Sequence, residues 1–419
     1  KELWYKAPIT PMDDLHGNLR GIIEHMDDIQ NLGIDVLYMT PIFQSNSCHK
    51  YDTTDYYQID PSFGTTEDLK ELVQKAHERG MKVVLDAVYN HTGREFFAFA
   101  DILENGEKSK YRDWYFIDGF PLKSEWGEIP NFKCFGYYGG MPKLNLKNPE
   151  VEKYITDVAC YWIKECDIDG WRLDVGDEIS HFFWKNFRKA VKAVKKDMLI
   201  IGEIWHYAGD FLEGDEWDTV MNYPFYLNLI DLLADEKITV SQFVQNLGYL
   251  KGRLHKNCYP LMWNLIDSHD TARFLHLCND NKKKQHLAAA FQLLLPGMPM
   301  IYYGDEYAMP GANDPDCRRG MYWDEEYQDK EMYEWYKRLI QVRKSHACIV
   351  EGELAGSVTE DEEGTVVLIR KNGEETIAMI FNCSSSAKKF NEYTQKYNLL
   401  TENTFDGNVE GFDAAVIVL

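Results

Sequence analysis

The sequence contains no apolar run of about 18 residues, the length that a membrane-spanning helix needs. Its nine cysteines are scattered, odd in number and without a CxxC pair. This pattern argues against a disulfide framework and against paired-cysteine zinc sites, and it predicts reduced thiols in a cytoplasmic protein. The opening residues, KELWYKAPIT, show no charged segment followed by an apolar one, so no secretory signal is predicted.

Positive charge is also scarce in this sequence. The 419 residues include 45 Lys and Arg against 68 Asp and Glu, which gives a formal net charge of −23. A surface of this sign repels phosphate groups, so neither nucleic acid nor an anionic membrane is expected as a partner. A neutral ligand is not repelled. The hydrophobic share of 45% predicts a globular protein rather than a disordered one.

Short apolar runs alternate with helical patterns along most of the chain. The expected strands are Trp4–Ile9, Val36–Thr40, Lys82–Ala87, Gly170–Val175, Leu199–Ile204, Thr219–Asn222, Leu261–Ile266 and Met300–Tyr303. Short runs without polar alternation are typical of parallel strands buried on both faces. Eight strands that alternate with helices predict an α/β fold, a (β/α)8 TIM barrel. A doubly wound open sheet is the alternative.

Helix signals occupy the segments between the expected strands. Thr65 stands at an N-cap position, with Asp68 three residues later and Gly80 at the far end of an apolar face. Asn148-Pro149 opens a second helix. Further helices are expected over His181–Lys195 and Lys282–Leu295.

Two segments interrupt this alternation. Residues 92–146, between strand three and its helix, are rich in aromatics, Gly and Lys, and an excursion of this length usually carries function. After about residue 350, VVLIRK, TIAMIF and AAVIVL are separated by turn-like segments and predict a small antiparallel β domain. We therefore expect a barrel over 1–91 and 147–345, an excursion (domain B) over 92–146, and a C-terminal β-sandwich-like domain over 346–419.

Three of the expected strands end in a carboxylate, namely Asp174, Glu203 and Asp270. Barrel enzymes hold their catalytic groups at the rim where such strand ends meet. Arg172 lies on the same side of its strand as Asp174 and favours its ionised form, as a nucleophile toward an anomeric carbon requires. Apolar neighbours of Glu203 favour its protonated form, which suits a general acid. A structural salt bridge at Arg172 and a loop brace at Glu203 are the alternatives when each motif is taken alone.

Two further motifs place polar residues at strand ends. In DAVYNH, Asp86 and Asn90 are expected to brace the rim, whereas His91 is expected to contact ligand. In NLIDSHD, the pair His269 and Asp270 supplies both donors and acceptors for the hydroxyls of a neutral sugar. An ordinary ion pair near a helix start is the alternative for the second motif.

DAVYNH, GWRLDVGDE, GEIW and DSHD resemble, in this order, the four short conserved regions of the α-amylase family, glycoside hydrolase family 13. MPKLN at 141–145 resembles a fifth region in the form typical of cyclomaltodextrinases, neopullulanases and maltogenic amylases. HKYDTTDYYQIDPSFGT, YYGDE and NDPDCRRGM are similar to segments of the same subgroup. The resemblance covers roughly residues 20–340, and the tail is similar to the C-terminal β domain of the family.

The resemblance implies a role for each matching residue. Asp174 would be the nucleophile, Glu203 the acid/base, and Asp270 the group that grips the hydroxyls of the reacting glucose. Asp86 and Asn90 would be structural neighbours of the site. The substrate-binding residues would be Tyr51, His91, Arg172, Trp205, His206, His269, Asp314 and Arg318.

Some of these residues have a more specific implied position. Tyr51 would be a stacking platform, Trp205 would lie on the leaving-group side, and Asp314 and Arg318 would contact the next glucose on the non-reducing side. No grouped acids indicate a calcium site, so we expect neither a metal nor a cofactor. Gly176, where Ala or Val is more usual in the family, is expected to have a minor effect.

These observations predict a retaining glycoside hydrolase that cleaves α-1,4-glucosidic bonds, and also α-1,6 bonds, in maltodextrins, cyclomaltodextrins or starch-like α-glucans. A transglycosylase or isomerase that uses the same covalent intermediate is one alternative. A non-catalytic carbohydrate-binding relative is another, although all three acids are present. Subgroup members usually carry an additional N-terminal β domain that forms a dimer and walls in the site, whereas this sequence starts at strand one. Ring and linear substrates, and the oligomeric state, are therefore all left open.

Overall fold

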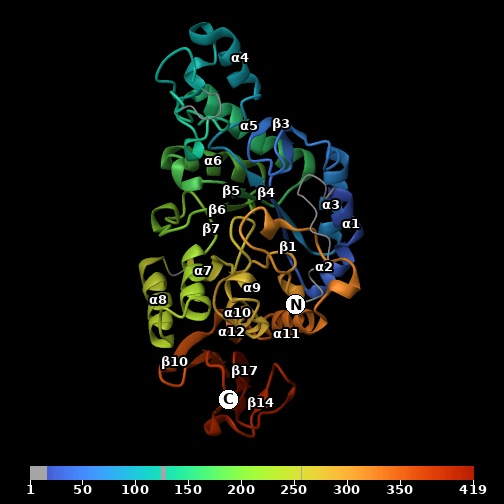
Figure 1. Ribbon diagram of the computed structural model, residues 1–419, viewed down its shortest axis with the longest axis vertical. Coiled ribbons are helices and arrows are strands. Elements are labelled where there is room, and N and C mark those ends of the chain that lie inside the picture. The colour runs from blue at the N-terminus through green and yellow to red at the C-terminus, as the bar shows by residue number, and fades with distance from the viewer. Residues whose placement is uncertain (1–16, 124–128, 256) are drawn as a thin grey trace. The chain divides into compact units, whose positions relative to one another are not determined.

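The computed structural model describes residues 17–123, 129–255 and 257–419. They form two compact units, which we call the first unit (His16–Ile204 with Asp210–Val220) and the second unit (Trp205–Gly209 with Met221–Leu419) (Figure 1). The predicted strand Trp4–Ile9 lies outside the described residues.

A five-stranded parallel sheet forms the centre of the first unit. Its strands, in spatial order, are β1 (Val36–Met39), β4 (Lys82–Ala87), β5 (Gly170–Leu173), β6 (Leu199–Gly202) and β7 (Thr219–Val220). Asp86 in β4 lies opposite Arg172 in β5, and Leu173 lies opposite Gly202 in β6. This register places Asp174 and Glu203, each the first residue after its strand, at the same carboxyl edge of the sheet.

Helices cover this sheet in the order that the sequence predicts. They are α1 (Leu19–Glu24), α2 (Met26–Leu32), α3 (Thr66–Glu78), α5 (Pro149–Cys166) and α6 (His181–Val194). Consecutive ones pack side by side, α1 on α3, α3 on α5 and α5 on α6 (Figure 1). The start of α3 is a capping box in which the Thr65 hydroxyl accepts from the Asp68 N–H and the Asp68 carboxylate accepts from the Thr65 N–H. Asn148 caps α5, so both predicted helix starts are confirmed.

Two excursions leave the carboxyl edge of the sheet. The first is an antiparallel hairpin of β2 (Phe43–Ser45) and β3 (Thr53–Ile59). The second is the predicted excursion after strand three, which contains α4 (Phe97–Asn105) and extends beyond β3 and α5 in Figure 1. It returns where the Leu144 N–H donates to the Asn90 carbonyl at 3.0 Å, next to a β-bridge between His91 and Lys143.

The second unit continues the alternation of strands and helices. Its elements before the tail are α7 (Tyr223–Leu229), the π-helical turn η7 (Ile230–Ala234), α8 (Val240–Arg253), β8 (Trp263–Asn264), α9 (Phe274–Leu277), α10 (Lys282–Leu294), β9 (Met298–Pro299), α11 (Lys330–Ser345) and α12 (Ala347–Glu351). The strands β8 and β9 pair in parallel. The prediction of the last strand at Met300–Tyr303 was wrong: pairing with β8 ends where the Met300 N–H donates to Asn264, and a turn then closes between Asp305 and Tyr302.

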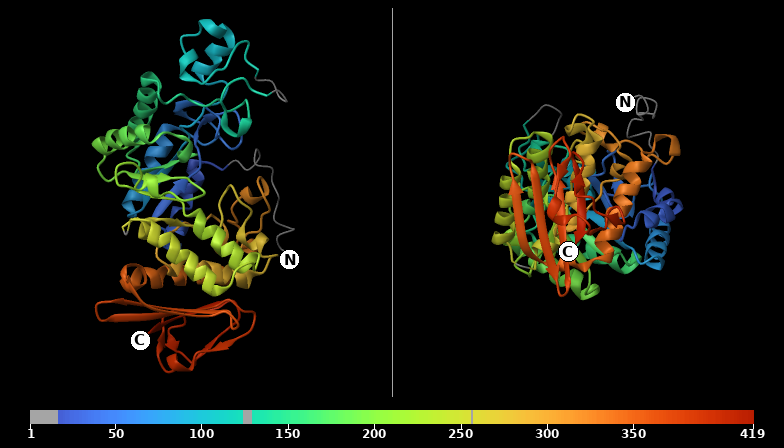
Figure 2. Two further views of the ribbon diagram at one scale, coloured as in Figure 1. Left: turned by 90° about the vertical axis from the view of Figure 1, so that its left-hand side faces the viewer. Right: turned by 90° about the horizontal axis from the view of Figure 1, so that it is seen from below.

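An antiparallel sheet forms the tail of the second unit, as the sequence predicts. Its strands, in spatial order, are β10 (Glu353–Glu360), β11 (Thr365–Asn372), β12 (Glu375–Asn382), β17 (Asp413–Val418), β14 (Tyr397–Asn398) and β15 (Asn403–Thr404), and β13 (Lys388–Lys389) pairs with β16 (Asn408–Val409) outside it. Figure 2 shows this sheet lying against the helices that precede it. Phe291 of α10 stacks on Phe381 of β12 at 4.2 Å, which joins the sheet to the rest of the unit.

None of the helices in the described residues combines the length and the apolar character that crossing a membrane would require. The exact domain boundaries predicted from the sequence, at 91/92, 146/147 and 345/346, stay a prediction.

Trp217 packs directly behind the carboxyl edge of the first unit's sheet. It is buried and stacks on Phe211 at 4.0 Å. A Cβ atom on Gly202, the last residue of β6, would lie 2.2 Å from Trp217, and one on Gly176 would lie 2.8 Å from it. The space that Ala or Val would occupy at Gly176 is therefore filled by the indole ring, so this glycine has a larger structural role than the sequence suggested.

We predict that Gly176→Ala lowers the free energy of unfolding by about 1–3 kcal/mol, the usual effect of forcing a methyl group into a packed core. Trp217→Phe removes the ring atoms that the new methyl group would meet. In a double-mutant cycle followed by chemical denaturation, the two substitutions should therefore offset each other. Additive losses would show that Trp217 does not limit the size of residue 176.

Candidate active site

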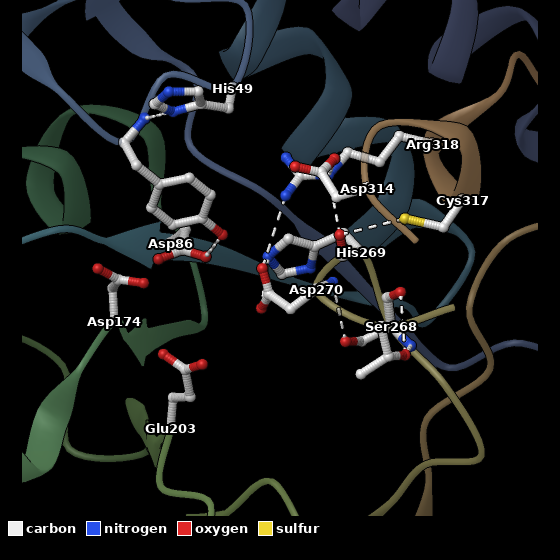
Figure 3. A network of polar contacts seen from close by, with 12 residues as sticks. His49, Asp86, Asp174, Glu203, Ser268, His269, Asp270, Asp314, Cys317 and Arg318 are labelled. Atoms are coloured by element: carbon white, nitrogen blue, oxygen red, sulfur yellow. Dashed lines mark hydrogen bonds and ion pairs between the residues drawn. The ribbon is translucent and has the colours of Figure 1, made fainter. Parts of the chain in front are cut away.

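Arg172 lies at the centre of a cluster of three carboxylates in the first unit. Its Nη1 donates to Asp174 Oδ1 at 3.0 Å and to Asp86 Oδ2 at 3.1 Å. Its Nη2 forms an ion pair with Glu203 Oε2 at 3.1 Å. Figure 3 shows Asp86, Asp174 and Glu203 directing their carboxylates into one region from three neighbouring strands. One guanidinium thus holds the two predicted catalytic acids of this unit together.

The electrostatics of this cluster follow from its burial. Arg172 is fully buried, and the three acids are at most 7% exposed. Burial lowers the pKa of Arg172, but the charges of Asp86 and Glu203 outweigh it and hold the pKa well above its ordinary value. Arg172 is therefore a permanent cation, and the two aspartates beside it, Asp86 and Asp174, carry more negative charge than it neutralises when both are ionised.

Asp86 is fixed by two tyrosine hydroxyls in addition to Arg172. Its Oδ2 accepts from Tyr38 at 2.6 Å and from Tyr51 at 3.2 Å. Burial, and next the charge of Asp86, raise the pKa of Tyr51 well above its ordinary value, so the hydroxyl keeps its proton and remains a donor. Asp86 therefore connects Tyr51 of the β2–β3 hairpin to Arg172 of the sheet.

Glu203 lies in more polar surroundings than the apolar residues of IIGEIW suggested. Besides Arg172, its Oε2 accepts from the Val175 N–H at 2.9 Å. Val175 has φ 46°, a left-handed conformation that is strained for a β-branched residue. The strained turn follows Asp174 directly and points a backbone donor at Glu203. It thereby links the positions of the two acids.

Asn90 connects the sheet edge to the excursion. Its Oδ1 accepts from Lys143 Nζ at 2.7 Å, and its Nδ2 donates to Glu178 Oε2 at 3.2 Å. Lys143 also forms an ion pair with Glu178 at 2.6 Å. The lysine of the MPKLN segment therefore fastens the returning end of the excursion beside the site.

His91 is buried and neutral. Its Nε2 donates to the Tyr51 carbonyl at 3.0 Å, and its ring stacks on Phe135 of the excursion at 5.2 Å. Burial lowers the pKa of His91 to about 4, against a weaker opposing effect of the hydrogen bond to Tyr51. Near neutral pH, therefore, the imidazole can both donate and accept.

The second unit holds Asp270 in a network of its own (Figure 3). Asp270 Oδ2 lies 3.1 Å from His269 Nε2, and Asp270 Oδ1 lies 3.6 Å from Arg318 Nη2. Arg318 Nε donates to the His269 carbonyl at 2.8 Å and forms an ion pair with Asp314 Oδ1, also at 2.8 Å. His269, Asp270 and Asp314 are thus joined through Arg318, and the Asp270 side chain is 29% exposed.

Trp205 follows Glu203 in the chain and presents an aromatic surface in the second unit. It stacks nearly parallel on Tyr223 of α7 at 3.9 Å and remains 42% exposed. The Tyr223 hydroxyl lies 3.4 Å from Ser268 Oγ. Tyr223 therefore supports Trp205 and contacts the loop that carries Asp270. His206 is exposed, and its Nδ1 lies 3.4 Å from the Tyr207 carbonyl.

Sequence reasoning grouped the acids but missed several residues that hold them. These are Tyr38, Val175, Glu178 and Tyr223. A tyrosine hydroxyl within the apolar run VLYM was the available signal for Tyr38, whereas the backbone angle at Val175 leaves no mark in the sequence. Within the described stretches, no group of three or more His, Cys, Asp or Glu side chains is arranged to hold a metal ion.

Comparison with known proteins supplies the family. The model for the alpha amylase catalytic domain matches residues 9–328. The chain is 47% identical over 384 residues to a cyclomaltodextrinase of Geobacillus thermopakistaniensis (strain MAS1), covering 92% of this chain and 65% of that protein. It is 43% identical over 383 residues to neopullulanase 2 of Thermoactinomyces vulgaris, covering 91% of this chain and 65% of that protein. The chain thus spans about two thirds of the length of these relatives.

A solved structure supplies the fold. The ligand-free cyclic α-maltosyl-(1→6)-maltose hydrolase of Arthrobacter globiformis matches with a TM-score of 0.89 and 35% identity, over 96% of this chain and 90% of that one. The predicted (β/α)8 barrel with a C-terminal antiparallel β domain is therefore confirmed. With a family model that covers most of its length, the chain belongs to the α-amylase family.

Proposed function

We propose that this chain is a retaining glycoside hydrolase that cleaves α-1,4-glucosidic bonds, and also α-1,6 bonds, in maltodextrins, cyclomaltodextrins or starch-like α-glucans. The observation that carries the proposal is the shared guanidinium of Arg172, which binds Asp174 and Glu203 at the ends of adjacent strands. A retaining glycosidase needs two carboxyl groups about 5–5.5 Å apart, one on each side of the scissile bond.

In the proposed reaction, Glu203 protonates the bridging oxygen while Asp174 attacks the anomeric carbon. The C–O bond to the leaving sugar breaks, and a glucosyl ester forms on Asp174. Glu203, now ionised, takes a proton from water, which attacks the same carbon and releases Asp174. The ion pair between Arg172 and Asp174 keeps the nucleophile ionised until it attacks, and it favours the carboxylate that is released when the ester is hydrolysed.

The surplus negative charge around Arg172 supports this chemistry. The transition state resembles an oxocarbenium ion and carries positive charge at the sugar ring. Buried carboxylates that are already oriented stabilise such charge without reorganisation. We assign Asp270 to the hydroxyls of the reacting glucose, with His91 and His269 as further hydroxyl ligands and Tyr51 as the stacking platform.

The remaining assignments concern neighbouring sugars. Trp205 would stack on the leaving-group side, with His206 beside it, and Asp314 and Arg318 would contact the next glucose on the non-reducing side. The names of the relatives point to cyclomaltodextrins, pullulan and cyclic maltosyl-maltose as substrates of those proteins, and this range is the reason to include α-1,6 bonds. A cytoplasmic location fits the nine cysteines, all of them described and none in a disulfide.

Replacing the nucleophile tests the proposal directly. We expect Asp174→Asn to reduce kcat by more than about 10⁴-fold, since an amide cannot form the glycosyl ester. Activity would be measured by chromatography of products from β-cyclodextrin, pullulan, soluble starch and maltotriose. Asp215→Asn is the matched control, because this acid of the same unit pairs with Lys185 at the surface.

The control variant should retain full activity, and both variants should keep the circular dichroism spectrum of the unmodified protein. Turnover by Asp174→Asn comparable to that of the control would refute the assignment. New oligosaccharides at high maltose concentration would identify transglycosylation through the same intermediate.

The low pKa of His91 gives a second prediction. Because the folded chain accepts this proton only near pH 4, while the unfolded chain accepts it near 6.5, stability should fall as the pH falls between these values. The contribution is about 3 kcal/mol across the window. His91→Asn should flatten the pH dependence of unfolding there, measured by denaturant titration at each pH.

His25→Asn serves as the control, since His25 lies at the surface beside Asp28. An unchanged slope between pH 6.5 and pH 4 in His91→Asn would show that His91 is not held neutral in the folded protein.

A further inference from the structure

A second buried charge cluster lies under the loop that carries Asp270. It consists of Asp267, which follows β8, Arg273, which caps α9, and Asp305, which begins the 3₁₀ turn η9 (Asp305–Tyr307). The exposed fractions of these residues are 1%, 0% and 1%. Two acids and one base are thus enclosed together in the core of the second unit.

A hydrogen bond between the two acids of this cluster requires a proton, because an ionised carboxylate only accepts. Arg273 Nη1 donates to Asp305 Oδ1 at 3.2 Å, and the Phe274 N–H donates to Asp267 Oδ2 at 2.7 Å. The carboxyl groups of Asp267 and Asp305 lie within hydrogen-bonding reach of each other. Their other oxygens, Asp267 Oδ1 and Asp305 Oδ2, are buried, and no donor among the described residues reaches them. Two carboxylates cannot form this bond unless one of them is protonated.

Among the described residues, the charged groups that act most strongly on Asp305 are Asp267, Arg273 and Glu306. Arg273 faces Asp305, and Glu306 adds further negative charge. The Tyr336 ring of α11 lies within reach of the same acids, and Gln285 of α10 donates only to the Asp305 backbone carbonyl, at 3.0 Å. The guanidinium of Arg273 is itself enclosed by the rings of Tyr302 and Tyr303, at 4.4 and 5.0 Å.

Burial is the first cause that raises the pKa of both acids, and the charge of Asp267 raises the pKa of Asp305 further, well above its ordinary value. Like charges that share a buried site normally push one proton onto one member of the pair. Asp267 also accepts a hydrogen bond from the Phe274 N–H, and this backbone donor favours the ionised form of Asp267.

We propose that Asp305 is protonated at neutral pH and donates its proton in a hydrogen bond to Asp267, and that this pair with Arg273 positions Asp270. The second part rests on the function proposed above. Asp305 is thus a positioning residue rather than a catalytic one.

The connection to Asp270 runs through Arg273 and one loop. Arg273 Nε donates to the Cys317 carbonyl at 3.1 Å, and the Arg273 N–H donates to the Gly311 carbonyl at 3.0 Å. Arg318, which follows Cys317 in the chain, donates to the His269 carbonyl and contacts Asp270. A second negative charge beside Arg273 would therefore disturb the segment that holds Asp270.

The sign of the pH effect follows from the raised pKa of Asp305. The folded protein holds this proton more tightly than the unfolded chain, in which the pKa of the aspartate is 3.8. The proton therefore stabilises the folded state in full below pH 3.8, and this stabilisation is lost as the pH rises through the pKa of the folded state. An asparagine at 305 supplies an N–H to Asp267 and a carbonyl to Arg273 at every pH. The stability gain of Asp305→Asn should therefore increase with pH.

The test compares the Tm of the full chain and of Asp305→Asn from pH 5 to pH 8. We expect a gain of a few degrees at pH 8 that shrinks toward pH 5, with kcat at neutral pH retained within a few-fold. The infrared carbonyl absorption of buried protonated carboxylic acids at pH 7 should be weaker in the variant by the contribution of one carboxyl group, since Glu306, whose pKa burial raises to about 7, absorbs in the same band. Asp27→Asn is the control, because Asp27 also pairs with an arginine, Arg79, but at the surface.

If Asp305→Asn folds poorly, Asp267→Asn provides a second test, because an asparagine at 267 supplies an N–H for the bond between residues 267 and 305. The double variant should be less stable than either single one, since Arg273 then has no ionised partner in the pair. A Tm difference independent of pH, or an infrared band unchanged in both single variants, would overturn the shared proton. Both readouts are independent of sugar cleavage, so they stand even if the proposed activity fails. In Asp305→Asn, the Tm could show the expected pH dependence while the pH dependence of kcat/KM stays the same as in the unmodified chain. That result would overturn the positioning role alone.

Discussion

The ion pairs of Arg172 with three carboxylates are the interaction on which the site of the first unit depends. A buried cation with this many partners is costly to break, because removal of any one member leaves charge without compensation. Each partner comes from a different strand, so the strand register and the cluster determine one another. The strained turn at Val175 and the packing of Trp217 behind Gly176 belong to the same constraint.

The two units use buried arginines in different ways. In the first, Arg172 directly contacts Asp174 and Glu203, the two carboxyl groups that we propose to react. In the second, Arg273 lies behind the loops and acts through backbone carbonyls, while Arg318 makes the contact with Asp270. Direct contact tunes charge, whereas indirect contact fixes position. This difference explains why the second cluster needs a neutral acid to remain balanced.

Prediction from the sequence succeeded where a residue's role follows from its place on one element. Asp174 and Glu203 were placed at one edge of the sheet because each follows an apolar strand, and Thr65 was recognised as an N-cap because its partner Asp68 lies three residues away. The catalytic roles of the two acids stay a prediction. Prediction failed where partners are distant: Tyr38 meets Asp86 across 48 positions, and Lys143 meets Asn90 across 53. The apolar flanks of Glu203 suggested dry surroundings, but backbone geometry at Val175 and the second nitrogen of Arg172 supply polar ones.

The proposed reaction requires that Arg172 hold Asp174 as an ionised nucleophile that forms a glucosyl ester. Trapping the ester with a 5-fluoro-α-glucosyl fluoride, followed by peptide mass spectrometry, tests it most directly. We expect one added sugar on the peptide that contains Asp174, and a strongly slowed rate of labelling in Arg172→Gln. A sugar attached to Glu203 or Asp270, or hydrolysis of starch that inverts the anomeric configuration without any covalent adduct, would contradict it.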